Sequence, residues 1–246
     1  MDRDATVVVE DAASVRTVTI NRPEVHNCVD STTADALEAA IREFEGADAL
    51  HVLVLTGAGG NAFCSGADLK HPPRLRDAGP MGITRLDVSK PTIAAIEGYC
   101  FAGGLELACW CDVRIAGASS AFGVLNRRWG VPLIDGGTQR LPRIVGLGNA
   151  LYLIETGVRI DASTALRMGL LQEVVEDGSA LDRARVLAER IASYPQASLR
   201  ADRTSAVALD GIAAEAARGE PTLRDPDMAA GLERFRAGDR PAPPSV

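Results

Sequence analysis

A glycine-rich stretch from residue 98 to residue 106 has residue types whose spacing could stabilise a developing negative charge. Glycines permit backbone conformations and close approaches that a Cβ forbids, and amides at the start of a helix can point at an anionic oxygen. Glu106 lies about one helical turn after Gly103, so it faces the same small volume. Enolate chemistry needs at least an amide that donates to the developing oxyanion and a carboxylate beside it that transfers a proton. An ordinary strand-to-helix turn with a solvated glutamate fits this stretch equally well.

The elements around this stretch must hold it in place. The apolar run Thr92–Ile96 before it and the run 107–110 after it predict a buried strand, a tight turn and a buried helix. Val15–Ile20, which is followed by Asn-Arg-Pro, reads as a strand, and 31–44 has helical spacing with Asp30 or Ser31 as its cap. Residues 52–55 are too apolar for an exposed strand and indicate a sheet covered on both faces.

The rest of the chain predicts mostly helices. Strands are expected at 112–116 and 171–176, and helices at 148–155, 162–168, 181–194 and 197–217, with a short helical piece at 232–235. Residues 130–138 read as a turn-rich segment. Residues 70–90 are rich in Pro, Gly, Arg and Asp without a period, and we expect a mobile loop over a site there.

Composition excludes several classes of function. The chain has 246 residues, a net charge of −7 and no apolar run of the roughly 20 residues that a membrane helix needs. The negative charge argues against nucleic-acid binding, and the five cysteines form no CxxC and have no His at metal-ligand spacing. Neither a GxGxxG fingerprint nor a GxxxxGK loop is present. We therefore expect a cytoplasmic protein that binds no metal, membrane or nucleic acid.

Several stretches in register from about residue 15 to residue 176 resemble the enoyl-CoA hydratase/isomerase (crotonase) family. The matching stretches are 21–24 (NRPE), 55–57 with 63–69 (LTG, FCSGADL), 90–95 (KPTIAA), 103–108 (GGLELA), 112–116 (DVRIA), 122–123 (FG), 136–143 (GGTQRLPR) and 169–170 (GL). The resemblance implies an α/β crotonase (ClpP/crotonase-like) fold, a spiral of ββα units with a C-terminal helical trimerisation region. It implies a core at 1–190 and a helical region at 191–246 in the same structural unit, assembled as a homotrimer or homohexamer.

The same resemblance implies an acyl-CoA thioester as substrate, with coenzyme A as part of that substrate and no separate cofactor. The backbone amides of Ala67 and Gly103 match the pair that holds the thioester oxygen, and Glu106 matches the first catalytic glutamate. Val25, Ser65 and Asp68 fall at positions expected to bind substrate, Val25 and Asp68 near the coenzyme A moiety. The cations expected to hold its phosphates are Arg22, Lys70, Arg74 and Arg76.

The sequence departs from the family pattern at the second catalytic glutamate, where Asn126 stands. An amide can hydrogen-bond substrate, but it cannot exchange a proton at neutral pH. Asp135 could replace the missing carboxylate, since some relatives carry a working aspartate near that turn, or it could cap the following helix. Arg127 or Arg128 could pair with Asp135 and lower its pKa.

Three functions remain open at this point. The first is a hydratase-like lyase that adds water to 2-enoyl-CoA through an enolate, with Glu106 and Asp135 as catalytic residues. The second is an enoyl-CoA isomerase that uses a single carboxylate. The third is a weakly active acyl-CoA-binding homologue, in which Asn126 marks loss of the hydratase mechanism.

Overall fold

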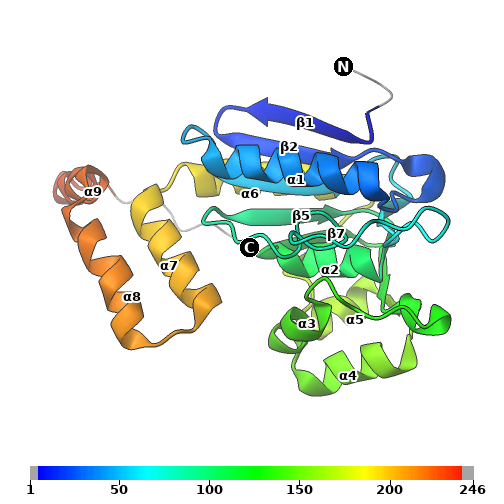
Figure 1. Ribbon diagram of the computed structural model, residues 1–246. Coiled ribbons are helices and arrows are strands. Elements are labelled where there is room, and N and C mark those ends of the chain that lie inside the picture. Colours follow the sequence, from blue (N-terminus) through cyan, green and yellow to red (C-terminus); the bar gives the residue numbers. More distant parts are fainter. Residues whose placement is uncertain (1–4, 240–246) are drawn as a thin grey trace. The chain divides into compact units, whose positions relative to one another are not determined.

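The computed structural model describes residues 5–239 (Figure 1). Contacts divide the chain into two compact units, residues 1–191 and residues 192–246, which are described separately. The proline-rich end of the chain, at 240–246, lies outside the described residues.

A six-stranded sheet forms the centre of the first unit. Its order is β1 (Val7–Ala12), β2 (Val15–Ile20), β3 (Val52–Gly57), β5 (Thr92–Ile96), β7 (Val113–Gly117) and β10 (Glu173–Val175). β1 is antiparallel to β2, and the other neighbours are parallel. Val52, Leu53, Val54 and Leu55 of β3 are all fully buried, which confirms the sheet covered on both faces.

A second, smaller sheet was not predicted from the sequence. It contains β4 (Ala62–Cys64), β6 (Tyr99–Phe101), β8 (Ala121–Gly123) and β9 (Ile160–Asp161). Strands this short leave almost no periodic signal. β3, β5 and β7 of the large sheet are each followed by a short strand of the small one, so strand pairs recur along the chain. β6 occupies part of the stretch that was predicted to be only a turn.

Six α-helices of the described residues belong to this part of the chain: α1 (Ser31–Gly46), α2 (Gly103–Trp110), α3 (Gly137–Val145), α4 (Leu147–Thr156), α5 (Ala162–Arg167) and α6 (Ala180–Ala192). Asp30 caps α1 by accepting a hydrogen bond from Thr33 N at 2.8 Å, as expected. α2 is buried along its whole length. α3 was missed, because Gly136, Gly137 and Pro142 lower the helical propensity of its sequence.

Residues 70–90 differ in part from the mobile loop that was predicted. They form no helix or strand, but Ala78, Met81, Ile83 and Thr84 are buried, with Thr84 fully so. Residues 78–84 therefore belong to the interior of the first unit, whereas the parts of the segment on both sides of them run mostly along the surface, with Leu75, Arg85 and Asp87 exposed.

The second unit contains α7 (Gln196–Ala208), α8 (Ile212–Gly219), a 3₁₀ helix (Glu220–Arg224) and α9 (Pro226–Arg236). The single helix expected at 197–217 is broken, because Leu209 and Gly211 have φ angles of +50° and +96°. α7 and α8 form a hairpin (Figure 1). α9 is longer than the short helical piece expected at 232–235.

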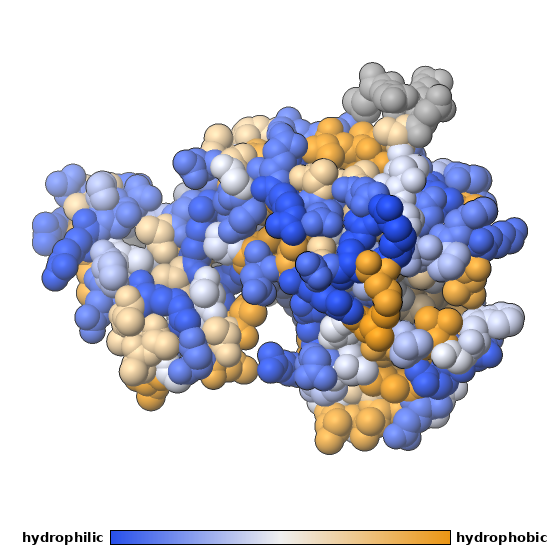
Figure 2. Space-filling model, viewed as in Figure 1, coloured by the Kyte–Doolittle hydropathy of each residue, from blue (hydrophilic) through white to orange (hydrophobic). Residues whose placement is uncertain are grey.

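Large apolar side chains remain exposed in both units. In the first unit they gather on the end that carries α4, where Leu147 and Leu151 are exposed (Figure 2). In the second unit Leu209, Ile212 and Phe235 are exposed. Across residues 5–239, none of the helices combines the length and apolar character needed to cross a bilayer.

Candidate active site

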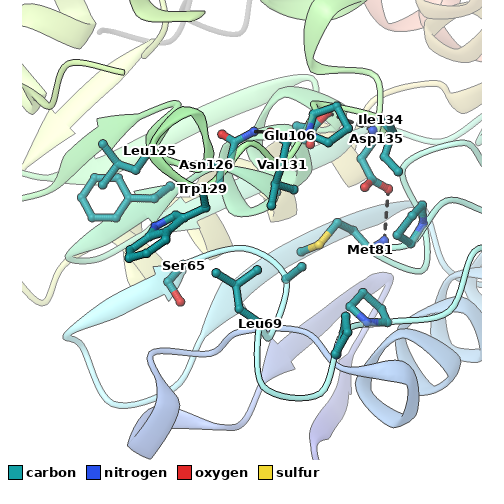
Figure 3. Close-up of a pocket in the computed structure, with 18 of the residues that line it drawn as sticks. Ser65, Leu69, Met81, Glu106, Leu125, Asn126, Trp129, Val131, Ile134 and Asp135 are labelled. Carbon is teal, nitrogen blue, oxygen red and sulfur yellow. Dashed lines mark hydrogen bonds between the residues drawn. The ribbon is translucent and has the colours of Figure 1, made fainter. Parts of the chain in front are cut away.

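A cavity of about 430 Å³ in the first unit brings together most of the residues singled out by the sequence. Its walls come from residues 65–81, 101–106 and 125–135. Glu106 and Asp135 lie toward one end, while Ser65, Leu69 and Trp129 lie toward the other (Figure 3). Apart from the two carboxylates, Ser65 and Asn126, the side chains that line it are apolar, which suits an apolar ligand with a few fixed polar contacts.

Two backbone amides at this cavity have no acceptor within the described residues. Ala67 and Gly103 both line the cavity, and neither N–H makes an intramolecular hydrogen bond there. The Ala67 segment is held by Val29, whose N–H donates to Gly66 O and whose carbonyl accepts from Asp68 N. The Gly103 amide is free because it begins α2, where the first N–H groups have no partner in the helix.

The backbone between these amides is strained and crowded. Ala102, directly before Gly103, has φ of +51° and ψ of −121°, a region that a residue with a Cβ rarely occupies. Gly66 has φ of +107°, and a Cβ there would lie 3.1 Å from Gly103 N. Only glycine lets the Ala67 segment approach the start of α2 this closely.

Glu106 extends from the first turn of α2 and is buried, with 3% of its surface exposed. Its Oε1 accepts hydrogen bonds from the backbone N–H groups of Asp135, at 2.9 Å, and Gly137, at 2.8 Å. Burial is the main cause that raises the pKa of Glu106 to about 7, and the negative charge of Asp135 also raises it. The hydrogen bonds from the two amides and the charge of Arg140 act in the opposite direction and lower it. The carboxyl group can therefore both accept and release a proton near neutral pH.

Asp135 is buried beside Glu106, and the structure excludes the capping role considered for it. The N-cap of α3 is Gly136, and no side chain caps that helix. The Asp135 Oδ1 instead accepts hydrogen bonds from Met81 N at 3.0 Å and from the Thr84 hydroxyl (Figure 3 shows the Met81 bond). Among the described residues neither Arg127 nor Arg128 forms an ion pair with Asp135, so that prediction is wrong.

Asn126 lines the cavity, but its side chain also closes a backbone turn. Its Nδ2 donates to Val131 O at 2.7 Å, and Val131 N donates back to Asn126 O at 3.3 Å. Its Oδ1 is buried without a hydrogen-bond partner. The turn positions Trp129, which reaches the cavity with 72% of its surface exposed.

The residues expected to bind substrate are not all at the cavity. Ser65 lines it, whereas Val25 and Asp68 do not. The Asp68 carboxylate, 6% exposed, forms an ion pair with Arg22 at 3.1 Å and accepts from the N–H groups of Lys70 and His71 at 3.0 and 3.2 Å. In this structure Asp68 therefore orders the loop that follows Ala67.

Three of the four cations proposed for the phosphates are already paired. Arg22 contacts Asp30 and Asp68, Arg74 contacts Asp35, and Arg76 contacts Asp35 and Glu38. Lys70 is exposed, and its side chain makes no ion pair with the residues that the structure describes. The positive charge near this loop is thus largely balanced by acidic residues of α1 and its cap.

Sequence reasoning missed three residues that hold the carboxylates: Met81, Thr84 and Arg140. Met81 and Thr84 contact Asp135, and Arg140 contacts the carbonyl of Thr84. Each of these contacts joins residues more than fifty positions apart, so no local sequence pattern predicts them. Gly137 was read only as part of a family stretch. A Cβ there would lie 2.9 Å from the Glu106 Oε1, so glycine is required for the observed contact. Residues 5–239 contain no cluster of three potential metal ligands.

Comparisons with known proteins show which family the chain resembles. The family model for enoyl-CoA hydratase/isomerase matches residues 10–213. An (E)-benzylidenesuccinyl-CoA hydratase of Thauera aromatica is 40% identical over 211 residues, covering 82% of each chain. A short-chain-enoyl-CoA hydratase of Clostridium acetobutylicum is 38% identical over 76% of this chain and 75% of its own.

Solved structures give the same result for the fold. A crystal structure of an enoyl-CoA hydratase from Mycobacterium tuberculosis superposes with a TM-score of 0.89 at 32% identity, covering 97% of this chain and 98% of that one. The crotonase fold predicted from the sequence is thereby confirmed. With the matched family model and these relatives, the chain belongs to the enoyl-CoA hydratase/isomerase family of enzymes.

Proposed function

We propose that the protein adds water across the double bond of a 2-enoyl-CoA thioester. One observation carries this proposal: a buried glutamate with a pKa of about 7 shares a cavity with two backbone amides that lack an acceptor. The amides provide a place for an anionic oxygen, and the glutamate provides proton transfer beside it.

The thioester carbonyl oxygen would accept hydrogen bonds from Ala67 N and Gly103 N. Both donors are fixed before substrate binds, so little reorganisation is needed when charge develops on that oxygen. Removing one such donor costs on the order of 10²–10³ in rate in other enzymes. The strained backbone at Ala102 supports this role, because it holds the Gly103 amide at the cavity.

Glu106 would first accept a proton from water and then return it to the substrate. The Glu106 carboxylate takes a proton from water as the water oxygen bonds to C3, and the C2–C3 π electrons move toward the carbonyl to form the enolate. Glu106 returns that proton to C2, which gives a 3-hydroxyacyl-CoA. Asp135 partners Glu106 by accepting a hydrogen bond from the other hydrogen of the attacking water.

The acyl group would occupy the apolar part of the cavity, near Met81, Val131 and Trp129. The names of the relatives include a short-chain-enoyl-CoA hydratase and a hydratase of an aromatic acyl-CoA. Their common chemistry, water addition to an enoyl-CoA, supports hydration here and leaves the acyl group unassigned.

Isomerisation is the second candidate, and the pKa of Glu106 favours it. A single carboxyl group with a pKa of about 7 could move a proton between the α and γ carbons of an enoyl-CoA without water. The same value argues against the binding-only alternative, since a raised pKa at a cavity is typical of catalytic groups.

Assembly and location are parts of the same proposal. A homotrimer or homohexamer would cover exposed apolar residues such as Leu209 and Ile212 of the second unit. Substrate would bind without a separate cofactor, in the cytoplasm. Ser65 and Asn126 would lie near it within the cavity, whereas Val25 and Asp68, which do not line the cavity, would lie near the coenzyme A moiety.

The test is an assay of the purified protein with crotonyl-CoA and, separately, with a 3-enoyl-CoA. Hydration predicts loss of the conjugated enoyl absorbance and a product heavier by one water. Formation of a conjugated 2-enoyl-CoA from the 3-enoyl isomer, without hydration, would favour the isomerase. Tight acyl-CoA binding with neither reaction would contradict the proposal.

A further inference from the structure

The buried part of the 70–90 segment is held by a small number of contacts to the turn at 134–136. Met81 N and the Thr84 hydroxyl both donate to the Asp135 Oδ1. Residues 78–86 form no helix or strand, and backbone hydrogen bonds such as Arg85 N to Ala78 O at 3.1 Å close turns within them. The contacts with Asp135, together with a bond from Arg85 Nη2 to Ile134 O at 2.8 Å, attach this segment to the turn. The position of the Asp135 carboxylate and the position of this segment therefore depend on each other.

Arg140, in the first turn of α3, connects the same two segments through its guanidinium group. Its Nη2 donates to Thr84 O at 2.7 Å, and its Nη1 donates to Asp135 O at 3.1 Å. Gly136 makes room for it: a Cβ at this residue would lie 2.1 Å from Nη1. A planar guanidinium can bridge two carbonyls at once, which the single ammonium group of a lysine does less well.

The Asp135 peptide that Arg140 holds is also the peptide that holds Glu106. Asp135 N donates to the Glu106 Oε1, one residue before the Gly137 N–H that donates to the same oxygen. A shift of the turn at 135–137 would therefore move both donors to Glu106, together with the Asp135 side chain.

Arg140 also carries a charge that no carboxylate in the described residues neutralises by direct contact. The charged groups that act on Glu106 are Asp135, which raises its pKa, and Arg140, which lowers it, both smaller in effect than burial or the Gly137 amide. Burial lowers the pKa of Arg140, and Cys109, Glu106, Asp87 and Cys111 act in the opposite direction.

From these contacts we propose that Arg140 is a positioning residue for both carboxylates. It locks residues 78–86 onto the turn at 135–137, and thereby fixes the Asp135 side chain and the two amides that hold Glu106. Thr84 is the second positioning residue, since its hydroxyl orients the Asp135 carboxylate and its carbonyl receives Arg140. This inference rests on the proposed function for its effect on rate, but not for its effect on the titration of Glu106.

Three variants separate the geometric effect from the electrostatic one. Arg140→Met removes both bonds and the charge, Arg140→Lys keeps the charge but not the bridge, and Arg143→Met removes an exposed arginine of the same helix as a control. With crotonyl-CoA, Arg140→Met should lower kcat by roughly 10- to 100-fold with little change in KM, because misplaced groups cost rate more than ground-state binding. Arg140→Lys should lower kcat by less, and Arg143→Met should not change it.

The titration of Glu106, followed by NMR of its labelled carboxyl carbon, gives a readout that does not need activity. The pKa of Glu106 should rise most in Arg140→Met, which loses both the charge and the bridge. It should also rise in Arg140→Lys, which loses the bridge that fixes the two amides, and it should keep the wild-type value in Arg143→Met. If the wild type hydrates no enoyl-CoA, the proposed function fails while this titration still tests the inference. An unchanged kcat of Arg140→Met in an active enzyme, or an unchanged Glu106 titration in Arg140→Lys, would overturn it.

Should Arg140→Met fail to fold, Thr84→Val carries the test. It keeps the volume of the side chain and removes only the hydroxyl that donates to Asp135. It should lower kcat without moving the titration of Glu106, since Thr84 does not contact Glu106. Wild-type kcat in this variant would overturn the positioning role of the 78–86 segment.

Discussion

The backbone N–H of Asp135 donates to the Glu106 Oε1 at 2.9 Å, so the position of the Glu106 carboxylate depends on the main chain of Asp135. One residue supplies a side chain to the cavity and, through its main chain, holds the side chain of the other. A substitution that changes only the Asp135 side chain should therefore leave Glu106 in place.

Asp135→Asn makes that substitution while keeping an oxygen that can accept from Met81 N and Thr84. We expect kcat for crotonyl-CoA hydration to fall roughly 10- to 100-fold, because the charge that partners the attacking water is lost while its position is kept. KM should change little. In the double variant with Glu106→Gln, the losses should not add, since both groups act in one step. Additive losses would show that the two carboxylates act independently.

Gly66→Ala tests the approach of the Ala67 segment to the start of α2. The new Cβ would lie 3.1 Å from both Gly103 N and the Ala102 Cβ, at a φ of +107° that alanine rarely adopts. We expect a loss of stability of about 1–3 kcal/mol and a lower kcat, because the two amides would no longer converge. Gly60→Ala is the matched control, since Gly60 also has a positive φ (+72°) but no atom within 4 Å of its Cβ position. A control as inactive as Gly66→Ala would argue against this role.

Asn126→Asp tests whether a carboxylate at this position can serve catalysis. Asp cannot donate to Val131 O, so the variant places a carboxylate against a carbonyl. We expect a loss of about 1–3 kcal/mol in the free energy of unfolding and no gain in hydration. Asn149→Asp removes a similar bond, to Val145 O, at a less buried site and should cost less. Faster hydration by Asn126→Asp would show that the side chain is free to reach substrate.

The sequence predicted the local part of the site but not its long-range part. Gly103 and Glu106 share one strand–turn–helix stretch, so their spacing already placed them together. Asp135 was a candidate for catalysis or for capping the next helix. The cap is excluded by Gly136 as the N-cap of α3 and by the contacts of Asp135 with Met81 and Thr84, more than fifty residues away. The pairing of Arg22 and Arg76 with acidic residues of α1 and its cap was hidden for the same reason. Sequence spacing reports neighbours along one element, whereas these contacts depend on how elements pack.

The stability of Glu106→Gln should depend on pH relative to the wild type. Because the folded protein raises the pKa of Glu106 to about 7 from 4.5, the stability that this group contributes is fully present below about pH 4.5 and is lost as pH rises through about 7. Glutamine does not titrate and can still accept from Asp135 N and Gly137 N. Relative to the wild type, the variant should therefore gain stability between pH 5 and pH 8, on the order of 3 kcal/mol. Chemical denaturation at both pH values checks this, and a stability difference that does not change with pH would contradict the raised pKa.

The most direct test of the central claim compares wild type and Glu106→Gln in crotonyl-CoA hydration from pH 5 to pH 9. The wild-type kcat/KM should rise with pH through a group with a pKa near 7, because the ionised carboxylate takes the proton from water. Glu106→Gln should lower turnover by roughly 10²–10⁴ and remove that dependence, with little change in thioester affinity. Full activity of Glu106→Gln, with the same pH profile as the wild type, would show that Glu106 is not the proton-transfer group.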